Sequence, residues 1–240
     1  MKKLFGLILI TGLFFLSCEN DDSNNDSETE KTTTAQITSW ADDWDSYSYS
    51  YDNEGRVIKI DRNNGEREYN LSYTEGTISI SGYATYTIVL GSNGYASSFS
   101  DEWDTYQYTY DSEGYMTKIE KEDDIVSNII VENGCISSWS KFEDGVEFVK
   151  NHTYSSAENV AGINNIYSEK GGFDRWLAEL GFFGKPTKYL CSGNQWDYSE
   201  SGSQITYEYD ENGFVLKEVK NFPADDWTEN YSYTWNIIEE

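Results

Sequence analysis

Apolar and polar residues alternate along most of this chain, and one phrase carries the alternation three times. It reads YSYDNEGRVIKI at residues 49–60, YTYDSEGYMTKI at 108–119 and YEYDENGFVLKE at 207–218. Each copy is a run with tyrosine at every second position, then Asp-x-x-Gly, then a second alternating run. Because successive side chains of a strand point to opposite faces, the phrase predicts a β-hairpin with one buried and one solvated face.

The Asp-x-x-Gly segment has the residues of a type I turn. Aspartate at the first position can accept local backbone N–H bonds, and glycine at the fourth tolerates positive φ. Weaker copies read YTEG at 73–76, GSNG at 91–94 and VENG at 131–134. Turns therefore recur roughly every 20 residues, which predicts one extended antiparallel sheet in place of several unlike domains.

The fold class predicted from this pattern is all-β: a curved or wound antiparallel meander of repeated hairpins, either barrel-like or a superhelical single sheet. The predicted strands are residues 36–40, 46–51, 57–62, 66–73, 77–81, 83–90, 95–100, 105–110, 116–120, 126–131, 135–142, 146–152, 205–209, 214–221 and 229–238.

Residues 155–190 interrupt the strand period. Four apolar residues there follow helical spacing: Phe173, Trp176, Leu177 and Leu180. Gly181 follows as a C-terminal cap, so one short helix is expected near 173–181. We expect it to cover a sheet edge or plug the mouth of the sheet, with Arg175 and Glu179 paired on its outer side.

The first residues have the composition of a targeting segment. Residues 1–17 combine a basic start with an apolar run too short to span a membrane, and they end at Cys18. This resembles a bacterial lipoprotein signal, in which the cysteine is lipidated. Residues 18–35 are polar and acidic, which predicts a disordered tether. Residues 36–240 are expected to form a single β domain.

The charge balance limits the partners. The chain has 17 basic and 43 acidic residues, a net charge of −26. Phosphate and anionic lipid surfaces need basic protein surfaces, so no nucleic-acid partner is predicted, and contact with a membrane is expected through the lipid anchor only. Clustered carboxylates could hold Ca²⁺, but no stretch matches a calcium loop, so no metal or other cofactor is predicted. The polar second face of the strands argues against a membrane-embedded barrel.

The sequence contains little that would support catalysis. His152 is the only histidine and lies in a strand pattern, which indicates a structural or surface role. No phosphate-binding loop, dinucleotide motif, nucleophile elbow or paired-cysteine zinc pattern occurs. We therefore expect a non-enzyme with no catalytic residues, although a two-carboxylate glycosidase stays open on residue counts alone. Cys135 and Cys191 are expected either to form a disulfide that pins the helical insertion or to remain buried thiols.

The chain resembles two known protein families, and both resemblances include the hairpin phrase. The YDxxGR segment at 51–56 resembles the YD repeats of large shell-forming bacterial proteins. More of the chain, roughly residues 36–240, resembles a family of Bacteroidetes lipoproteins of unknown function described as having a porin-like β fold. The matching features are the lipoprotein signal, the acidic tether, the tyrosine hairpins and the late insertion WLAELGFFGKPTKYL at 176–190. This resemblance implies a wound antiparallel sheet with one short helix, and it implies no activity.

The acidic residues after Cys18 resemble the signal that precedes display of Bacteroidetes lipoproteins on the cell surface. This favours an outer-membrane, lipid-anchored protein on the cell surface over one on the periplasmic face. An ordinary spacer remains the alternative reading of the same residues.

Three tryptophans in acidic turns are the only residues whose pattern suggests a binding site. Trp44, Trp103 and Trp227 each follow two acidic residues at the ends of hairpins opposite to the Asp-x-x-Gly turns. Indole faces stack on sugar rings and carboxylates accept hydroxyl hydrogen bonds, so these three residues are the candidate ligand-binding site. The alternative is that each indole folds back and closes its own hairpin.

We therefore expect a monomeric, non-enzymatic envelope lipoprotein that binds a glycan or another extracellular ligand. The alternative is a structural or protein-interaction lipoprotein of an outer-membrane complex.

Overall fold

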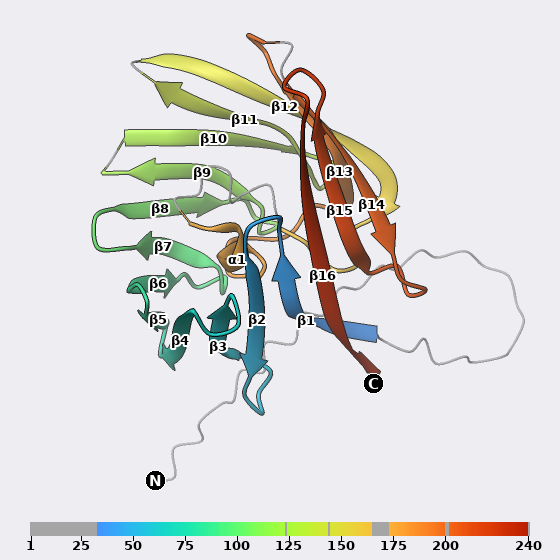
Figure 1. Ribbon diagram of the computed structural model, residues 1–240. Helices are drawn as coiled ribbons and strands as arrows, with labels where there is room; N and C mark the ends of the chain where they lie inside the picture. The colour runs from blue at the N-terminus through green and yellow to red at the C-terminus, as the bar shows by residue number, and fades with distance from the viewer. Residues whose placement is uncertain (1–32, 123, 144, 165–172, 200–201, 240) are drawn as a thin grey trace, which may run out of the picture. The chain divides into compact units, whose positions relative to one another are not determined.

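The computed structural model describes residues 33–122, 124–143, 145–164, 173–199 and 202–239. These residues form a closed barrel of 16 antiparallel strands, in which each strand pairs with its sequence neighbours and β16 pairs with β1 (Figure 1). The strands are β1 (Thr33–Ala41), β2 (Ser46–Tyr51), β3 (Val57–Arg62), β4 (Arg67–Thr74), β5 (Thr77–Gly82), β6 (Tyr86–Leu90), β7 (Ala96–Ser100), β8 (Thr105–Tyr110), β9 (Met116–Lys121), β10 (Asp124–Glu132), β11 (Cys135–Glu143), β12 (Val146–Glu158), β13 (Tyr189–Trp196), β14 (Gly202–Tyr209), β15 (Val215–Phe222) and β16 (Trp227–Glu239).

The predicted all-β meander is confirmed, and it closes as a barrel. The register between β1 and β16 runs from Thr33 opposite Glu239 to Ala41 opposite Ser232, which excludes an open superhelical sheet. The sequence pattern missed β13, because its residues LCSGNQ do not alternate. It also ended β12 too early, since that strand continues to Glu158.

The three Asp-x-x-Gly turns have the predicted geometry. In the first, Asp52 Oδ1 accepts bonds from the backbone N–H groups of Glu54 and Arg56, both at 2.9 Å. Asp111 and Asp210 repeat this pattern at 2.8–2.9 Å. Gly55 takes a φ of +76°, which residues with a Cβ rarely adopt. The sequence phrase thus encodes one turn structure three times.

The two faces of the strands are sorted as the alternation predicted. In β2, Tyr47 and Tyr49 are buried while Ser46, Ser48 and Ser50 are exposed. The same alternation repeats in β4. The barrel interior is therefore aromatic and aliphatic and its outer face is largely polar, the reverse of strands that face lipid.

Within the part of the chain that the structure describes, no helix is both long enough and apolar enough to cross a membrane.

Tyrosine hydroxyls inside the barrel bind carbonyls on the preceding strand. The Tyr73 hydroxyl of β4 donates to the Val57 carbonyl of β3 at 2.7 Å. The same bond, from an even-numbered strand to an odd-numbered one, is made by Tyr51 to Ile37, Tyr110 to Ala96, Tyr154 to Ile136 and Tyr207 to Cys191. In the last hairpin Trp235 donates its indole N–H to the Val215 carbonyl. The repeated tyrosine thus fills the core and also satisfies backbone acceptors.

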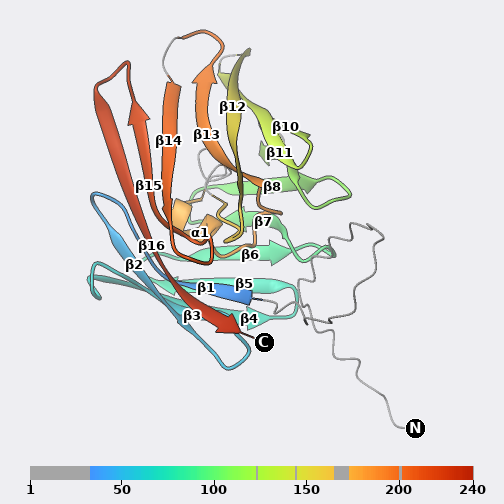
Figure 2. The ribbon, with the colours of Figure 1, turned by 90° about the vertical axis from the view of Figure 1, so that its right-hand side faces the viewer.

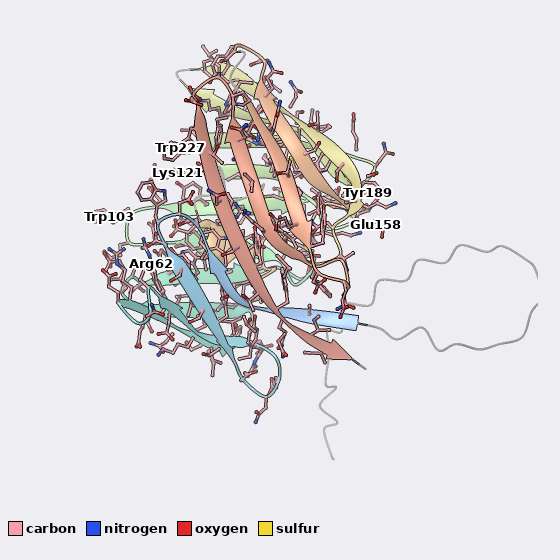
Figure 3. The ribbon with its side chains drawn as sticks, turned by 45° about the vertical axis from the view of Figure 1, so that its right-hand side comes forward. Arg62, Trp103, Lys121, Glu158, Tyr189 and Trp227 are labelled. Atoms are coloured by element: carbon pink, nitrogen blue, oxygen red, sulfur yellow. The ribbon has the colours of Figure 1, made fainter. Side chains whose placement is uncertain are left out.

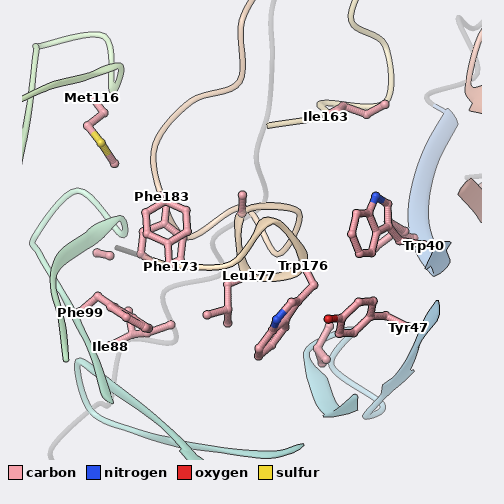
Figure 4. Packing of buried hydrophobic residues seen from close by; sticks show 14 of the residues in the cluster. Trp40, Tyr47, Ile88, Phe99, Met116, Ile163, Phe173, Trp176, Leu177 and Phe183 are labelled. Carbon is pink, nitrogen blue, oxygen red and sulfur yellow. The ribbon is translucent and has the colours of Figure 1, made fainter. Parts of the chain in front are cut away.

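The insertion between β12 and β13 fills one side of the interior (Figure 2). Its helix α1 (Arg175–Ala178) is only one turn long, shorter than predicted, and Gly181 follows with a φ of +75°, as a C-terminal cap requires. Trp176 packs against Tyr47, with ring centroids 5.9 Å apart (Figure 4). It also packs against Tyr69, with ring centroids 4.8 Å apart. Phe173 and Phe183 stack on each other at 3.7 Å.

The insertion is also tied to turns at one end of the barrel. The backbone N–H of Lys185 donates to the Gly114 carbonyl, and that of Lys188 donates to the Gly134 carbonyl, each at 2.8 Å. Of the two predicted roles for the insertion, plugging is thus the observed one.

We expect Tyr73→Phe to lower the free energy of unfolding by about 1–2 kcal/mol, because the Val57 carbonyl loses its donor in a buried place. Urea denaturation measures this. Tyr83→Phe is the matched control, since Tyr83 is 58% exposed and its substitution should change stability by less than about 0.5 kcal/mol. Equal losses in the two variants would contradict a stabilising role for the tyrosine bond.

Candidate functional site

The acidic tryptophan turns lie at the end of the barrel opposite to the Asp-x-x-Gly turns, as predicted. In the turn between β1 and β2, Asp42 Oδ1 accepts from the backbone N–H groups of Trp44 at 2.8 Å and Asp45 at 2.7 Å. Asp101 holds Trp103 with the same two distances in the turn between β7 and β8. The first aspartate therefore closes the turn, and the indole is not needed for that purpose.

The indoles of these turns project into solvent. Trp44 is 74% exposed, Trp103 is 84% exposed and Trp227 is 45% exposed. Trp44 and Trp103 therefore do not fold back on their own hairpins, as the alternative interpretation expected. Figure 3 shows Trp103 and Trp227 at one end of the barrel and Glu158 and Tyr189 at the other.

The structure brings two of the three predicted residues together. Trp44 and Trp227 have nearly parallel rings, with centroids 6.5 Å apart and planes 9° apart. They meet because β1 pairs with β16, which places the first and last hairpin turns side by side. Asp43 joins the same two hairpins, since its carboxylate accepts from the Asn230 backbone N–H at 2.9 Å and from its side-chain amide. Trp103 stands apart, because β3–β6 separate its turn from β2.

Basic residues engage the aspartate that follows each of the two exposed indoles. Asp45 binds Arg62 at the end of β3 through two hydrogen bonds, and this bonding lowers the pKa of the Asp45 carboxyl. Asp104 binds Lys121 at the end of β9 at 2.7 Å. The carboxylates that were expected to bind sugar hydroxyls thus serve largely to build and fix the turns.

A buried charge cluster inside the barrel was not predicted. Arg175 of α1 binds Glu218 of β15 at 2.6 Å, and the Tyr233 hydroxyl donates to the same glutamate at 3.1 Å. Arg175 also lies over the Tyr231 ring, 3.9 Å from its centroid. The expected pair of Arg175 and Glu179 exists at 3.7 Å, but the prediction of an outer position is wrong, since the Glu179 side chain is only 2% exposed. The barrel surrounds the helix, so its polar face is buried as well.

Burial raises the pKa of Glu179 to about 7, because little solvent remains to stabilise the charged carboxylate. Arg175 opposes this shift, and so does the Asn164 backbone N–H, which donates to the carboxylate at 3.3 Å. Glu179 is therefore a buried group whose protonation changes near neutral pH.

The remaining residues singled out from the sequence are Cys18, His152, Cys135 and Cys191. Cys18 lies outside the described residues. His152 lies in β12 opposite Asn194. Cys135 and Cys191 are both buried thiols and are not bridged to each other, so the second of the two expectations holds. No group of three or more histidine, cysteine, aspartate or glutamate side chains among the described residues is arranged to hold a metal ion.

Solved structures share the fold. A porin-like protein from Bacteroides uniformis ATCC 8492 matches with a TM-score of 0.65 and 18% identity, covering 83% of this chain and 98% of the other. A porin-like protein from Bacteroides vulgatus ATCC 8482 matches with a TM-score of 0.58 and 13% identity over the same shares. No protein-family model matches the chain, and no curated protein does. The expected porin-like fold is confirmed, while membership of the lipoprotein family stays a prediction.

We expect Glu179→Gln to flatten the pH dependence of stability between about pH 4.5 and 7. The folded-state pKa of about 7 lies above the ordinary glutamate value of 4.5, so this contribution to stability is fully present below about pH 4.5 and is lost as the pH rises to about 7. The loss amounts to about 3 kcal/mol at 1.36 kcal/mol per unit. Chemical denaturation at several pH values measures it. An unchanged slope in the variant would show that Glu179 is not the titrating group.

Proposed function

We propose that this protein is a lipid-anchored envelope protein that binds glycans through the exposed indoles at one end of its barrel. The observation that carries the proposal is the exposure of Trp44 and Trp103, each held outward by a turn that an aspartate has already closed. Such indoles contribute nothing evident to the core, and large flat apolar rings in water favour contact with another molecule. Sugar rings present apolar faces that stack on indole, with hydroxyls left for nearby polar groups.

The proposal of lipid anchoring rests on the signal segment and Cys18. A single acyl chain gives only marginal binding to a membrane, and stable anchoring needs more than one. The polar outer face of the barrel supports attachment through lipid in place of insertion of the strands.

We also propose that the protein is not an enzyme. Glu179 and Glu218 are a pair of buried acids, the feature that would favour a two-carboxylate hydrolase. Their side chains are only 2% and 1% exposed, and Arg175 binds both. A buried, ion-paired glutamate is poorly placed to meet a substrate, so this cluster is better explained as the anchor of α1 to the barrel wall.

A structural or protein-interaction role in an outer-membrane complex is the second candidate. The pairing of Trp44 with Trp227, together with the bonds between Asp43 and Asn230, supports it, because these contacts join the first and last hairpins. On this view the two indoles stabilise the closure of the barrel, and only Trp103 would be available for a partner.

We expect the mature chain to bind glycans on an array, with loss of binding in the Trp44→Ala, Trp103→Ala, Trp227→Ala triple variant. Testing Trp103→Ala separately from the Trp44→Ala, Trp227→Ala pair shows which indoles bind, since the two groups lie apart. Each single contact should be worth roughly 1 kcal/mol, or about fivefold in affinity. Tyr209→Ala at the opposite end is the control, because Tyr209 is also exposed, at 41%.

Absence of binding to every glycan of such an array would reject the glycan proposal and leave the protein-interaction role. Circular dichroism and denaturation of each variant show whether the barrel is intact.

We expect Cys18→Ser to abolish incorporation of labelled fatty acid and to release the protein from the membrane fraction, because Cys18 is the proposed acceptor. Cys135→Ala should keep the label, since that thiol is buried in the barrel. Labelling that survives Cys18→Ser would contradict lipidation at this residue.

A further inference from the structure

Exposed aromatic side chains gather at one end of the barrel. Among the described residues, the exposed aromatic side chains are Trp44, Tyr83, Trp103, Tyr198, Tyr209 and Trp227. All except Tyr209 lie in or beside turns that lead from an odd-numbered to an even-numbered strand, and these turns share one end of the closed barrel. Single exposed rings are ordinary on a protein surface, but their concentration at one rim indicates a binding surface.

Tyr83 lies on the rim between Trp44 and Trp103. Its turn joins β5 to β6, whereas Trp44 follows β1 and Trp103 follows β7. Neighbouring strands are about 4.8 Å apart, so the three turns follow one another along the rim at intervals of roughly 19 Å and roughly 10 Å. Because Trp227 lies beside Trp44, four exposed rings form one aromatic row: Trp227, Trp44, Tyr83 and Trp103.

Tyr83 is held in place by its own surroundings. Its backbone N–H donates to the Glu68 carbonyl at 2.9 Å. Gly82 permits this close approach, since a Cβ there would lie 2.1 Å from the Glu68 carbonyl oxygen. The Arg67 guanidinium lies over the Tyr83 ring, 4.0 Å from its centroid, and the side chain is still 58% exposed. The ring is therefore positioned before a ligand binds, like the indoles in their aspartate-closed turns, which lowers the entropic cost of binding.

The spacing of the rings favours a sugar chain over a protein partner. The core of a protein interface is a contiguous, desolvated patch. In the aromatic row, exposed acidic residues and intervals of roughly 10–19 Å separate one turn from the next. A polysaccharide repeats one ring at regular intervals and carries hydroxyls between the apolar faces. It therefore suits separate stacking rings with hydrogen-bond acceptors beside them.

The charges beside the aromatic row argue against an acidic ligand. An exposed acidic residue immediately precedes each of its three indoles: Asp43, Glu102 and Asp226. Two basic side chains near the row are already engaged, since Arg62 binds Asp45 and Lys121 binds Asp104. A carboxylated or sulfated chain would bring its anions close to the exposed carboxylates, where like charges repel.

We infer that the aromatic row binds one extended polysaccharide chain without acidic groups, which stacks on several of the rings at once. This inference rests on the proposed glycan binding and specifies its substrate class as a polymer. A sugar unit in a chain occupies about 5 Å, so roughly six units span the roughly 29 Å along the rim from Trp44 to Trp103. A chain bound at one ring is held near the next, so affinity rises with chain length up to this span.

Isothermal titration calorimetry of the mature chain with oligosaccharides of increasing length tests the inference. The ligands are cello-, xylo-, manno- and malto-oligosaccharides of about two to about ten units, the corresponding series for any other glycan bound on the array, and oligogalacturonides as the acidic comparison. In the series that binds, we expect chains of about six or more units to bind about 25-fold more tightly than the disaccharide, or about fivefold for each of two further rings.

Substitutions along the row assign this gain to the rings. Tyr83→Ala and Trp103→Ala should each lower the affinity for long chains about fivefold and so reduce their advantage over the disaccharide. Tyr83→Phe is the matched control, because it keeps the ring and should bind long chains as the unsubstituted protein does. A longer chain also offers more places to bind, but that statistical gain would survive in both alanine variants.

Three outcomes would overturn the inference. Equal affinity for short and long chains, or a gain with length that both alanine variants retain, rejects the aromatic row while glycan binding stands. Tighter binding of oligogalacturonides than of every neutral series rejects a ligand without acidic groups. Binding to no glycan at all rejects the proposed function and this inference with it.

Discussion

A barrel of sixteen strands encloses more space than its own side chains can fill, and this constraint explains much of the chain. Barrels of about eight strands are filled by side chains, whereas those of 16–18 strands leave a channel. Here the strands turn apolar faces inward, and an empty apolar channel would forfeit the free energy of burial. The insertion between β12 and β13 supplies the missing volume, with Trp176, Phe173 and Phe183 at its centre.

Tyrosine also satisfies backbone carbonyls that face the barrel interior. Register shifts interrupt the pairing of some strands, as between Ile37 and Ser39 and between Ser50 and Tyr51. A phenylalanine would fill the same space and leave those carbonyls unsatisfied. In two copies of the phrase the bonding residue, Tyr51 or Tyr110, immediately precedes the turn, whereas in the third it is Tyr207, three residues before Asp210.

Much of the fold could be predicted because strand alternation and turn chemistry are local. The Asp-x-x-Gly hairpins, most strands, the helical break and Gly181 all followed from neighbouring residues. Closure of the barrel did not, since it depends on the pairing of β1 with β16, about 200 residues apart in sequence. For the same reason the helical spacing of Arg175 and Glu179 indicated a solvated pair, when a surrounding wall buries both.

The candidate site likewise combines features that local sequence predicts with features that depend on barrel closure. Exposed indoles could be proposed from the acidic tryptophan turns, yet the meeting of Trp44 with Trp227 depends on barrel closure. The contacts of Lys141 and Lys150 with Trp196 had no sequence signal, because only the strand register brings these residues together.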